Sequence, residues 1–228
     1  MGLYAIGDTH LSLRGNKAMD KFDGWQGYVE RLAEGMSSLS GEDTVVLCGD
    51  LSWGMSLEEA EADFAFLEQM PPRRKILLKG NHDYWWNTAS KMNAFFQAKG
   101  FTTFELLHNN CVLYEDIALC GTRGWFFEEE QDAQNEKVFQ RELMRLETSL
   151  KAAGEREKLC FLHYPPRYQG YLCQPIIDLM ARYGVTACYY GHLHGGSHRL
   201  AVVGDRDGIQ YQLVSADFLK FVPKKIRE

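Results

Sequence analysis

The chain has 228 residues, of which 45% are hydrophobic and 13% aromatic, so it can form one domain with a sizeable core and disorder is not expected. Its formal charge is −6 and its basic run, residues 224–227, lies at the very end, which argues against extensive nucleic-acid binding. No apolar stretch approaches the roughly 20 residues that span a bilayer, and the first residues lack the pattern of a signal peptide.

Six cysteines occur without any Cys-x-x-Cys spacing, and four of them lie inside apolar runs. We interpret them as free thiols buried in the core. Buried free thiols are typical of a reducing compartment, so the sequence predicts a cytoplasmic protein. It carries no signal of an oligomeric state.

Three short apolar runs in the first eighty residues predict buried strands, at residues 3–6, 44–48 and 75–78. Helices are expected between and after them, at residues 25–36, from a capping box formed by Ser56 and Glu59 to Pro71, and at 89–99 before Gly100. Such alternation of strands and helices favours a largely parallel sheet.

The regular alternation of predicted strands and helices ends in the second half of the chain. Three short strands, at residues 103–107, 111–114 and 117–120, are joined by turn-like sequences, so antiparallel pairing is expected. A helix at 133–152, a strand at 159–162, a helix from Pro175 to about residue 183 and a strand at 186–190 follow. Two strands, at 198–203 and 209–214, are expected to close a single domain that spans residues 1–228.

Side chains that can bind a metal ion follow five of the predicted strands. They are Asp8 with His10, Asp50, Asn81 with His82, His163, and His192 with His194. The i, i+2 spacing of Asp8 and His10 puts both side chains on one face of an extended segment, where both could hold one ion. A single histidine after a strand is usually structural, but five of the seven histidines stand at such positions. We interpret His108 and His198 as structural.

This series resembles the five signature motifs of the calcineurin-like metallophosphoesterase superfamily, in their usual order. The motifs are Asp8-Thr9-His10, Gly49-Asp50, Gly80-Asn81-His82-Asp83, His163 and Gly191-His192-Leu193-His194, and the resemblance covers about residues 3–195. It implies an α/β fold, a four-layer sandwich of two mixed β-sheets flanked by helices. It also implies a two-metal centre at one edge of the sandwich.

The resemblance also implies roles for the residues in these motifs. One ion would be held by Asp8, His10 and His194, the other by Asn81, His163 and His192, with Asp50 bridging them. The ions would be divalent or trivalent, with manganese, iron or zinc favoured. The implied activity is hydrolysis of a small phosphoester by a hydroxide that bridges both ions, with His82 donating a proton to the leaving oxygen.

Three positions stay open at this point. Protein serine/threonine phosphatases of the superfamily continue the second motif with an aspartate and an arginine, whereas Leu51 to Trp53 follow Asp50 here, so a protein phosphatase is disfavoured. Asp83 either orients His82 or caps the next turn. Arg123 follows a predicted strand and either binds the substrate phosphate or is a surface turn residue.

Aromatic residues crowd the same loops and suggest either a stacking wall for a nucleobase or a lipid-facing rim, although at least half should be core. They are Trp53, Trp85, Trp86, Trp125, Phe126, Phe127, Tyr164 and Tyr168. The run Glu128 to Glu130 is interpreted as a solvated face. The alternative enzyme is a nucleotide or nucleotide-linked phosphodiesterase or pyrophosphatase, and the non-enzyme alternative is a catalytically silent scaffold of this fold. The absence of a basic groove disfavours a nuclease.

Overall fold

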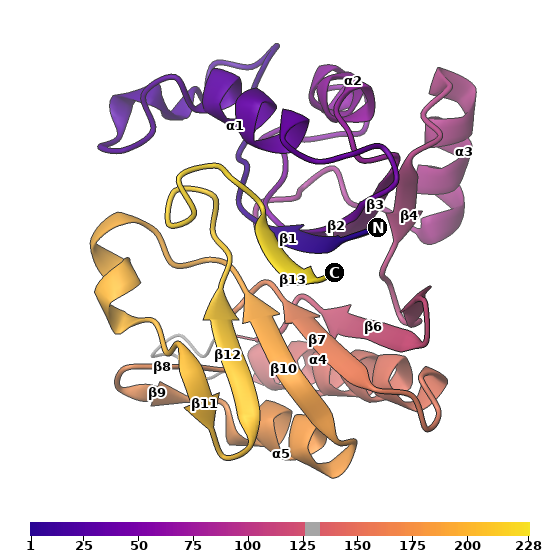
Figure 1. The fold of residues 1–228 in the computed structure, drawn as a ribbon, viewed down its shortest axis with the longest axis vertical. Helices are drawn as coiled ribbons and strands as arrows, with labels where there is room; N and C mark the ends of the chain where they lie inside the picture. The colour runs from indigo at the N-terminus through magenta and orange to yellow at the C-terminus, as the bar shows by residue number, and fades with distance from the viewer. Residues whose placement is uncertain (126–132) are drawn as a thin grey trace.

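Two β-sheets pack face to face in the computed structural model, which describes residues 1–125 and 133–228 (Figure 1). The first sheet has the strand order β13-β1-β2-β3-β4. Strands β1 to β4 run parallel and β13 is antiparallel to β1. Their bounds are β1 (Leu3–Ile6), β2 (Thr44–Cys48), β3 (Arg74–Leu78), β4 (Phe104–Leu106) and β13 (Lys224–Arg227).

The second sheet has the strand order β11-β12-β10-β7-β6-β5. Its four inner strands are parallel and its two edge strands are antiparallel. The bounds are β5 (Val112–Tyr114), β6 (Ile117–Thr122), β7 (Lys158–Leu162), β10 (Val185–Tyr190), β11 (Gly204–Arg206) and β12 (Ile209–Leu213). A separate small hairpin consists of β8 (Arg167–Tyr168) and β9 (Tyr171–Leu172).

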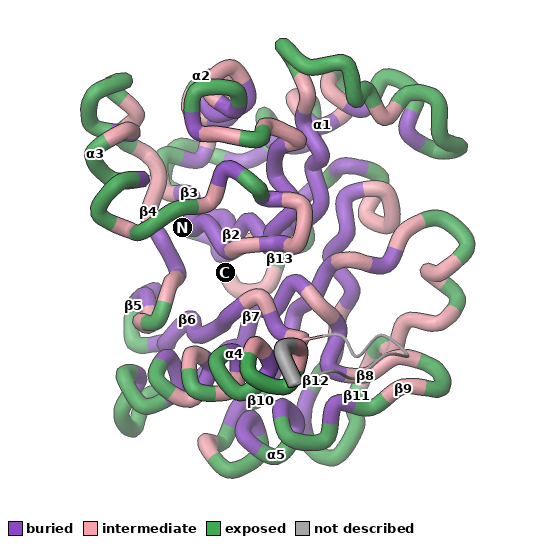
Figure 2. Tube along the Cα trace, turned by 180° about the vertical axis from the view of Figure 1, so that it is seen from behind, coloured by how far each residue is buried: buried purple, intermediate pink, exposed green. Residues whose placement is uncertain are grey.

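Helices cover the outer face of each sheet. Helices α1 (Tyr28–Ser37), α2 (Glu61–Gln69) and α3 (Ala89–Lys99) cover the first sheet, and α4 (Ala133–Ala152) and α5 (Gln174–Arg182) cover the second (Figure 1). The alternation within β1 shows the layering, because Leu3 and Ala5 pack between the sheets while Ile6 faces the helices. The inner strands of both sheets are buried, whereas the edge strands β11 and β13 are exposed or half-buried (Figure 2). The predicted four-layer sandwich is confirmed.

The predicted antiparallel group of three strands is partly wrong. Only β5 and β6 pair in this way, whereas β4 joins the first sheet, parallel to β3. Leu106 of β4 packs into the core beneath α2 and α3, and the N–H of Leu107 continues the ladder by donating to Leu77 O at 2.9 Å. The chain therefore crosses from one sheet to the other between β4 and β5.

Three further boundaries differ from prediction. The expected strand at 198–203 is wrong: a 3-10 helix, η2 (Gly195–Leu200), covers its first residues, and β11 begins only at Gly204. Asp217 accepts the N–H of Gly195 at the start of this helix. The basic run at the end forms β13, an edge strand, where lysines are common. Helix α2 begins only at Glu61, and the predicted capping box is half formed: Ser56 accepts the N–H of Glu59, but the Glu59 side chain accepts the N–H of Met55.

A second 3-10 helix, η1 (Met19–Lys21), lies in the predicted loop after β1. The cysteines are free thiols, five buried and Cys111 half-buried. No helix in the described part of the chain combines the length and apolar character that crossing a bilayer requires.

Candidate metal centre

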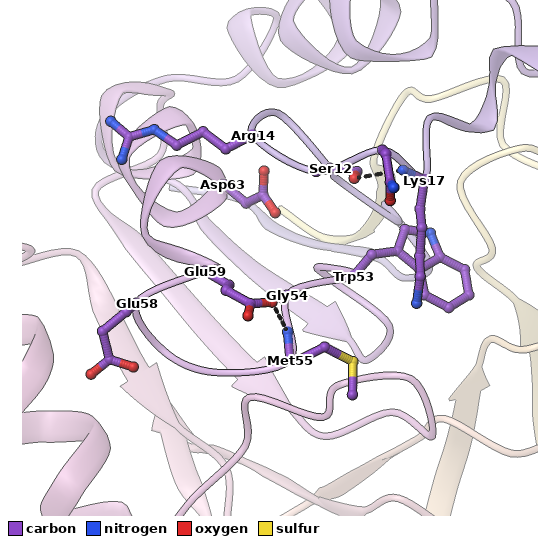
Figure 3. Close-up of a pocket in the computed structure, with 11 residues that line it drawn as sticks. Ser12, Arg14, Lys17, Trp53, Gly54, Met55, Glu58, Glu59 and Asp63 are labelled. Carbon is purple, nitrogen blue, oxygen red and sulfur yellow. Dashed lines mark hydrogen bonds between the residues drawn. The ribbon is translucent and has the colours of Figure 1, made fainter.

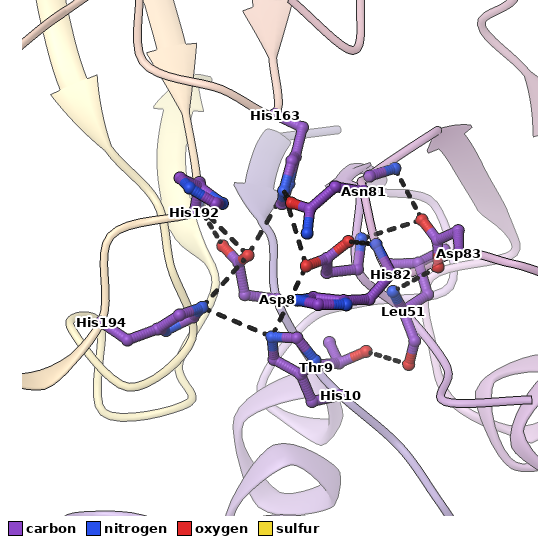
Figure 4. A network of polar contacts seen from close by, with 12 residues as sticks. Asp8, Thr9, His10, Leu51, Asn81, His82, Asp83, His163, His192 and His194 are labelled. Atoms are coloured by element: carbon purple, nitrogen blue, oxygen red, sulfur yellow. Dashed lines mark hydrogen bonds and ion pairs between the residues drawn. The ribbon is translucent and has the colours of Figure 1, made fainter. Parts of the chain in front are cut away.

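The seven predicted ligands follow the carboxyl ends of β1, β2 and β3 in the first sheet and of β7 and β10 in the second. Figure 4 shows the side chains of Asp8, His10, Asn81, His163, His192 and His194 close together. Parallel strands bring their carboxyl ends together, so distant motifs converge there. Asp8 and His10 follow β1, Asp50 follows β2, Asn81 follows β3, His163 follows β7, and His192 and His194 follow β10.

The first group of ligand atoms gathers around Asp8. Its Oδ1 lies 3.4 Å from Nε2 of His194, and that nitrogen lies 3.4 Å from Nε2 of His10. Potential ligand atoms of Asp8, His10 and His194 all lie within 4.8 Å of one another. This trio is the one that the sequence motifs imply for the first ion.

The second group gathers around His163. Its Nε2 lies 2.6 Å from Oδ1 of Asn81 and 3.5 Å from Oδ2 of Asp50. Asp50 Oδ2 also lies 3.8 Å from Nε2 of His10 in the first group, so this carboxylate stands between the two groups. The ring of His192 lies beside the second group, with its centroid 5.2 Å from that of His163.

The surroundings of His163 test whether these residues fit a cation. Its Nδ1 faces the carbonyl oxygen of Cys48 at 3.2 Å while its Nε2 faces Oδ1 of Asn81 at 2.6 Å. A neutral imidazole has one ring proton, so with the Asn81 oxygen at Nε2 either tautomer leaves one nitrogen lone pair against an oxygen. Burial lowers the pKa of His163 and disfavours a second proton. A metal ion at Nε2, with the proton on Nδ1, removes the conflict.

Burial and mutual charge shift the pKa of the candidate ligands strongly. Burial, with Asp8 nearby, raises the pKa of Asp50 to about 8, and burial lowers the pKa of His10 and His192 to about 3. Burial opposes the protonation of His194, but Asp8 and Asp217 raise its pKa to about 10. Without a cation the site must therefore retain protons, which a bound metal ion would displace.

The backbone of the centre is strained and closely packed. Asp8, His10, Asp50 and His192 all adopt positive φ, a conformation that non-glycine residues rarely take. Gly80 and Gly191 allow close approach, because a Cβ atom at either position would clash with the carboxylate of Asp50 or Asp8, respectively. These motif glycines thus let two loops reach the two carboxylates.

Asp217 is a residue of the site that the sequence analysis missed. It accepts from Nδ1 of His194 at 3.0 Å, which leaves Nε2 of His194 free to bind a cation, and from the N–H of Gly195 at 3.0 Å. His198, interpreted as structural, lies 3.1 Å from the same carboxylate. Asp217 comes shortly after β12, so its position after a strand was the available signal.

The side chain of Asp83 bonds to the backbone of the loops after β2 and β3. Its carboxylate accepts the N–H groups of Gly80, Asp50 and Leu51 at 2.7 to 2.8 Å, and Nε1–H of Trp85 at 3.0 Å. These bonds fit neither interpretation made from the sequence, because their backbone donors belong to Gly80 and the loop after β2, not to the next turn or to the ring of His82.

His82 is held by other neighbours. The N–H of His82 donates to Asp50 Oδ1 at 2.7 Å, and Nδ1 of its ring lies 3.3 Å from the hydroxyl of Tyr84. The indole of Trp53 packs against the same ring with a centroid distance of 4.5 Å.

Arg123 lies beside the loop of His163, since its carbonyl oxygen accepts the N–H groups of His163 and Tyr164. Its guanidinium approaches Glu142 at 3.6 Å. Among the aromatic residues Trp85 belongs to the core, with 1% of its surface exposed. Phe126, Phe127 and the run 128–130 lie outside the described residues.

The strand ends of this α/β sandwich bring an asparagine and histidines around the buried carboxylates of Asp8 and Asp50. This is the architecture of a metal-dependent phosphoesterase. The chain belongs to the calcineurin-like phosphoesterase family, whose model matches residues 1–196.

Solved structures resemble this chain at low sequence identity. A protein of unknown function, AQ665 from Aquifex aeolicus, is 14% identical with a TM-score of 0.52, over 98% of this chain and 95% of that one. TT1561 of Thermus thermophilus is 13% identical with a TM-score of 0.49, over 84% and 81% of the two chains. No curated protein matches the sequence significantly.

Proposed function

We propose that this protein is a metal-dependent phosphohydrolase that cleaves a small phosphoester at a centre of two ions, with manganese, iron or zinc favoured. The observation that carries the proposal is the position of Asp50, whose Oδ2 lies 3.5 Å from His163 and 3.8 Å from His10. One carboxylate can thus serve both groups of ligands. Membership of the phosphoesterase family supports the same chemistry.

In this proposal Asp8, His10 and His194 would hold one ion, Asn81, His163 and His192 would hold the other, and Asp50 would serve both. Two bound ions would neutralise charge on the phosphoryl group and lower the pKa of a water molecule between them. Cys48 O and Asp217 contact Nδ1 of His163 and of His194, which orients each ring so that its Nε2 could bind an ion.

His82 is the proposed proton donor to the leaving oxygen. Its backbone bond to Asp50 fixes the start of the side chain next to the shared carboxylate. Trp53 on the ring and the Tyr84 hydroxyl at Nδ1 restrict its rotation. The leaving group then departs on the side of the centre where Trp53 and Tyr84 lie.

Arg123 is the proposed contact to the substrate phosphate. It shares the carboxylate of Glu142 with Arg145, which approaches the same oxygen more closely, at 2.5 Å against 3.6 Å. A guanidinium carries five N–H donors, so Arg123 keeps donors for a phosphoryl oxygen.

The test compares His82→Ala with Asp50→Asn, using phenyl phosphate and 4-nitrophenyl phosphate and their methyl diesters as substrates. His82→Ala should keep its metal content but lose turnover, more for the phenyl than for the nitrophenyl esters, because a poor leaving group depends most on protonation. Asp50→Asn should lose metal. His108→Ala, a histidine away from the ligands, is the control and should retain both.

Full activity of His82→Ala would remove its proposed role. Absence of turnover by the wild-type protein with Mn²⁺, Fe²⁺, Co²⁺, Ni²⁺ and Zn²⁺ would instead favour the silent scaffold. A nucleotide panel distinguishes the nucleotide-linked alternative, which should then surpass the aryl esters in kcat/KM.

A further inference from the structure

A cavity of about 370 Å³ opens beside Trp53, between the loop after β1 and the turns before α2 (Figure 3). This volume falls within the range of roughly 300 to 1,000 Å³ that small-molecule sites occupy. Residues from these two segments and from α2 line it, among them Ser12, Arg14, Lys17, Trp53, Glu59 and, in α2, Asp63.

Trp53 connects this cavity to the candidate metal centre. The indole lines the cavity and also stacks on His10, with a centroid distance of 4.9 Å and an interplanar angle of 25°. Its centroid lies 4.5 Å from that of His82. The indole of Trp53 therefore stands between the cavity and the ring of the proposed proton donor.

Two of the acidic side chains that line the cavity accept hydrogen bonds from other groups of the protein. Asp63 accepts from Ser52 Oγ at 2.5 Å and from the N–H of Leu13 at 2.8 Å. Glu59 accepts the N–H of Met55 at 2.9 Å. Glu58 lies at the end of the cavity away from Trp53 (Figure 3).

The cation nearest the centre is Lys17. Its ammonium lies 4.9 Å from the centroid of the Trp53 ring. Among the described residues no carboxylate forms an ion pair with Lys17 or Arg14, the second cation of the cavity. The lining holds three carboxylates, Glu58, Glu59 and Asp63, against two cations, so the unpaired positive charge is local to the end of the cavity at Trp53, where Lys17 lies.

We propose that this cavity binds the leaving group of the substrate and that Lys17 selects leaving groups that carry a negative charge. The inference rests on the proposed function and narrows its substrate class to phosphoesters or phosphoanhydrides whose departing portion bears a second anion, a phosphate or a carboxylate. Trp53 provides the apolar wall along which that portion lies, and Lys17 provides the counter-charge.

The test uses two esters of nearly equal shape, 4-carboxyphenyl phosphate and 4-carbamoylphenyl phosphate, with the metal-loaded protein. The measured quantity is the ratio of their kcat/KM values, because comparing this ratio between variants cancels the intrinsic reactivity of each ester. The ratio of kcat/KM for the carboxy ester to that for the carbamoyl ester should be about tenfold higher in wild type than in Lys17→Gln, an effect of about 1.4 kcal/mol. Lys17→Arg should keep the preference, and Lys21→Gln, on the same loop outside the cavity, should match wild type.

A ratio that is the same in wild type and Lys17→Gln overturns the inference while leaving the phosphohydrolase proposal in place. Failure of the wild-type protein to hydrolyse either ester, as well as phenyl phosphate, overturns both. A fall of the ratio in Lys21→Gln equal to that in Lys17→Gln also overturns it, because the effect would then reflect general surface charge.

Discussion

The carboxylate of Asp83 accepts the N–H of Asp50 at 2.8 Å and the N–H of Gly80 at 2.7 Å with the same oxygen. One side chain thereby joins the loops after β2 and β3, which carry the shared carboxylate and the Asn81–His82 pair. Because Asp83 is 1% exposed, these charge-assisted bonds are shielded from water. The carboxylate fixes the distance between the two loops before any ion binds.

Asp83→Asn is expected to destabilise the protein by about 3 kcal/mol and to weaken metal binding as well. The groups that bond this carboxylate are all N–H donors, so an amide group would place N–H against N–H on one side. Urea denaturation gives the stability and metal titration gives the affinity.

Asp43→Asn is a matched control for that variant. Asp43 also accepts two backbone N–H groups, from Gly2 and Ser40, but it lies away from the centre. This variant should lose stability and keep its metal affinity. Equal metal affinity in wild type and Asp83→Asn would show that the loop junction does not set the ligand geometry.

Gly191→Ala tests the close approach of the loop after β10 to Asp8. A methyl group at this position would meet the Asp8 carboxylate, so the loop or the carboxylate must shift. We expect at least a tenfold loss of metal affinity, about 1.4 kcal/mol, with the fold retained. Gly196→Ala in the following turn is the control, since no atom lies within 4 Å of a Cβ there. Equal loss in both variants would point to general loosening of the turn.

The sequence predicts the candidate ligands of this site but not the residues that support them. Short apolar runs predicted the inner strands, and parallel strand ends must converge, so the seven candidate ligands could be named together. The support around them comes from contacts that no local pattern encodes. Asp217 reaches His194 across 23 positions of sequence, and Trp53 packs on His82 from another loop. Asp217 also bonds the N–H of Gly195 at the start of η2, the 3-10 helix that replaces the first part of the expected strand at 198–203.

Asp217→Asn should weaken metal binding by 10- to 100-fold, the usual effect of removing a carboxylate behind a ligand histidine. An amide can present its N–H to Nδ1 of His194 and favour the tautomer with the proton on Nε2, where the ion would bind. Isothermal titration with Mn²⁺ measures the change. His198→Gln changes the other ring near Asp217 and should have a small effect. A loss of Mn²⁺ affinity in His198→Gln larger than that in Asp217→Asn would contradict the role of Asp217 in orienting His194.

The metal-free protein should lose stability as the pH rises from about 7 to about 8. The pKa of Asp50 is raised to about 8 by burial and by Asp8, so the native state keeps a proton that the unfolded chain has lost. The pKa of His194 is raised to about 10 against burial by Asp8 and Asp217, and its protonated form likewise stabilises the native state. Both contributions decline with rising pH. His10 and His192, with pKa near 3, act in the opposite direction mainly at lower pH.

Urea midpoints measured in a chelator across this range test the expectation. Asp50→Asn removes one of the two titrating groups, so its midpoint should fall less steeply than that of wild type. With saturating Mn²⁺ the dependence should reverse, because metal ions compete with the protons and bind more tightly as the pH rises. If the urea midpoint of chelated wild-type protein rises from pH 7 to pH 8, burial and Asp8 do not raise the pKa of Asp50 as the structure indicates.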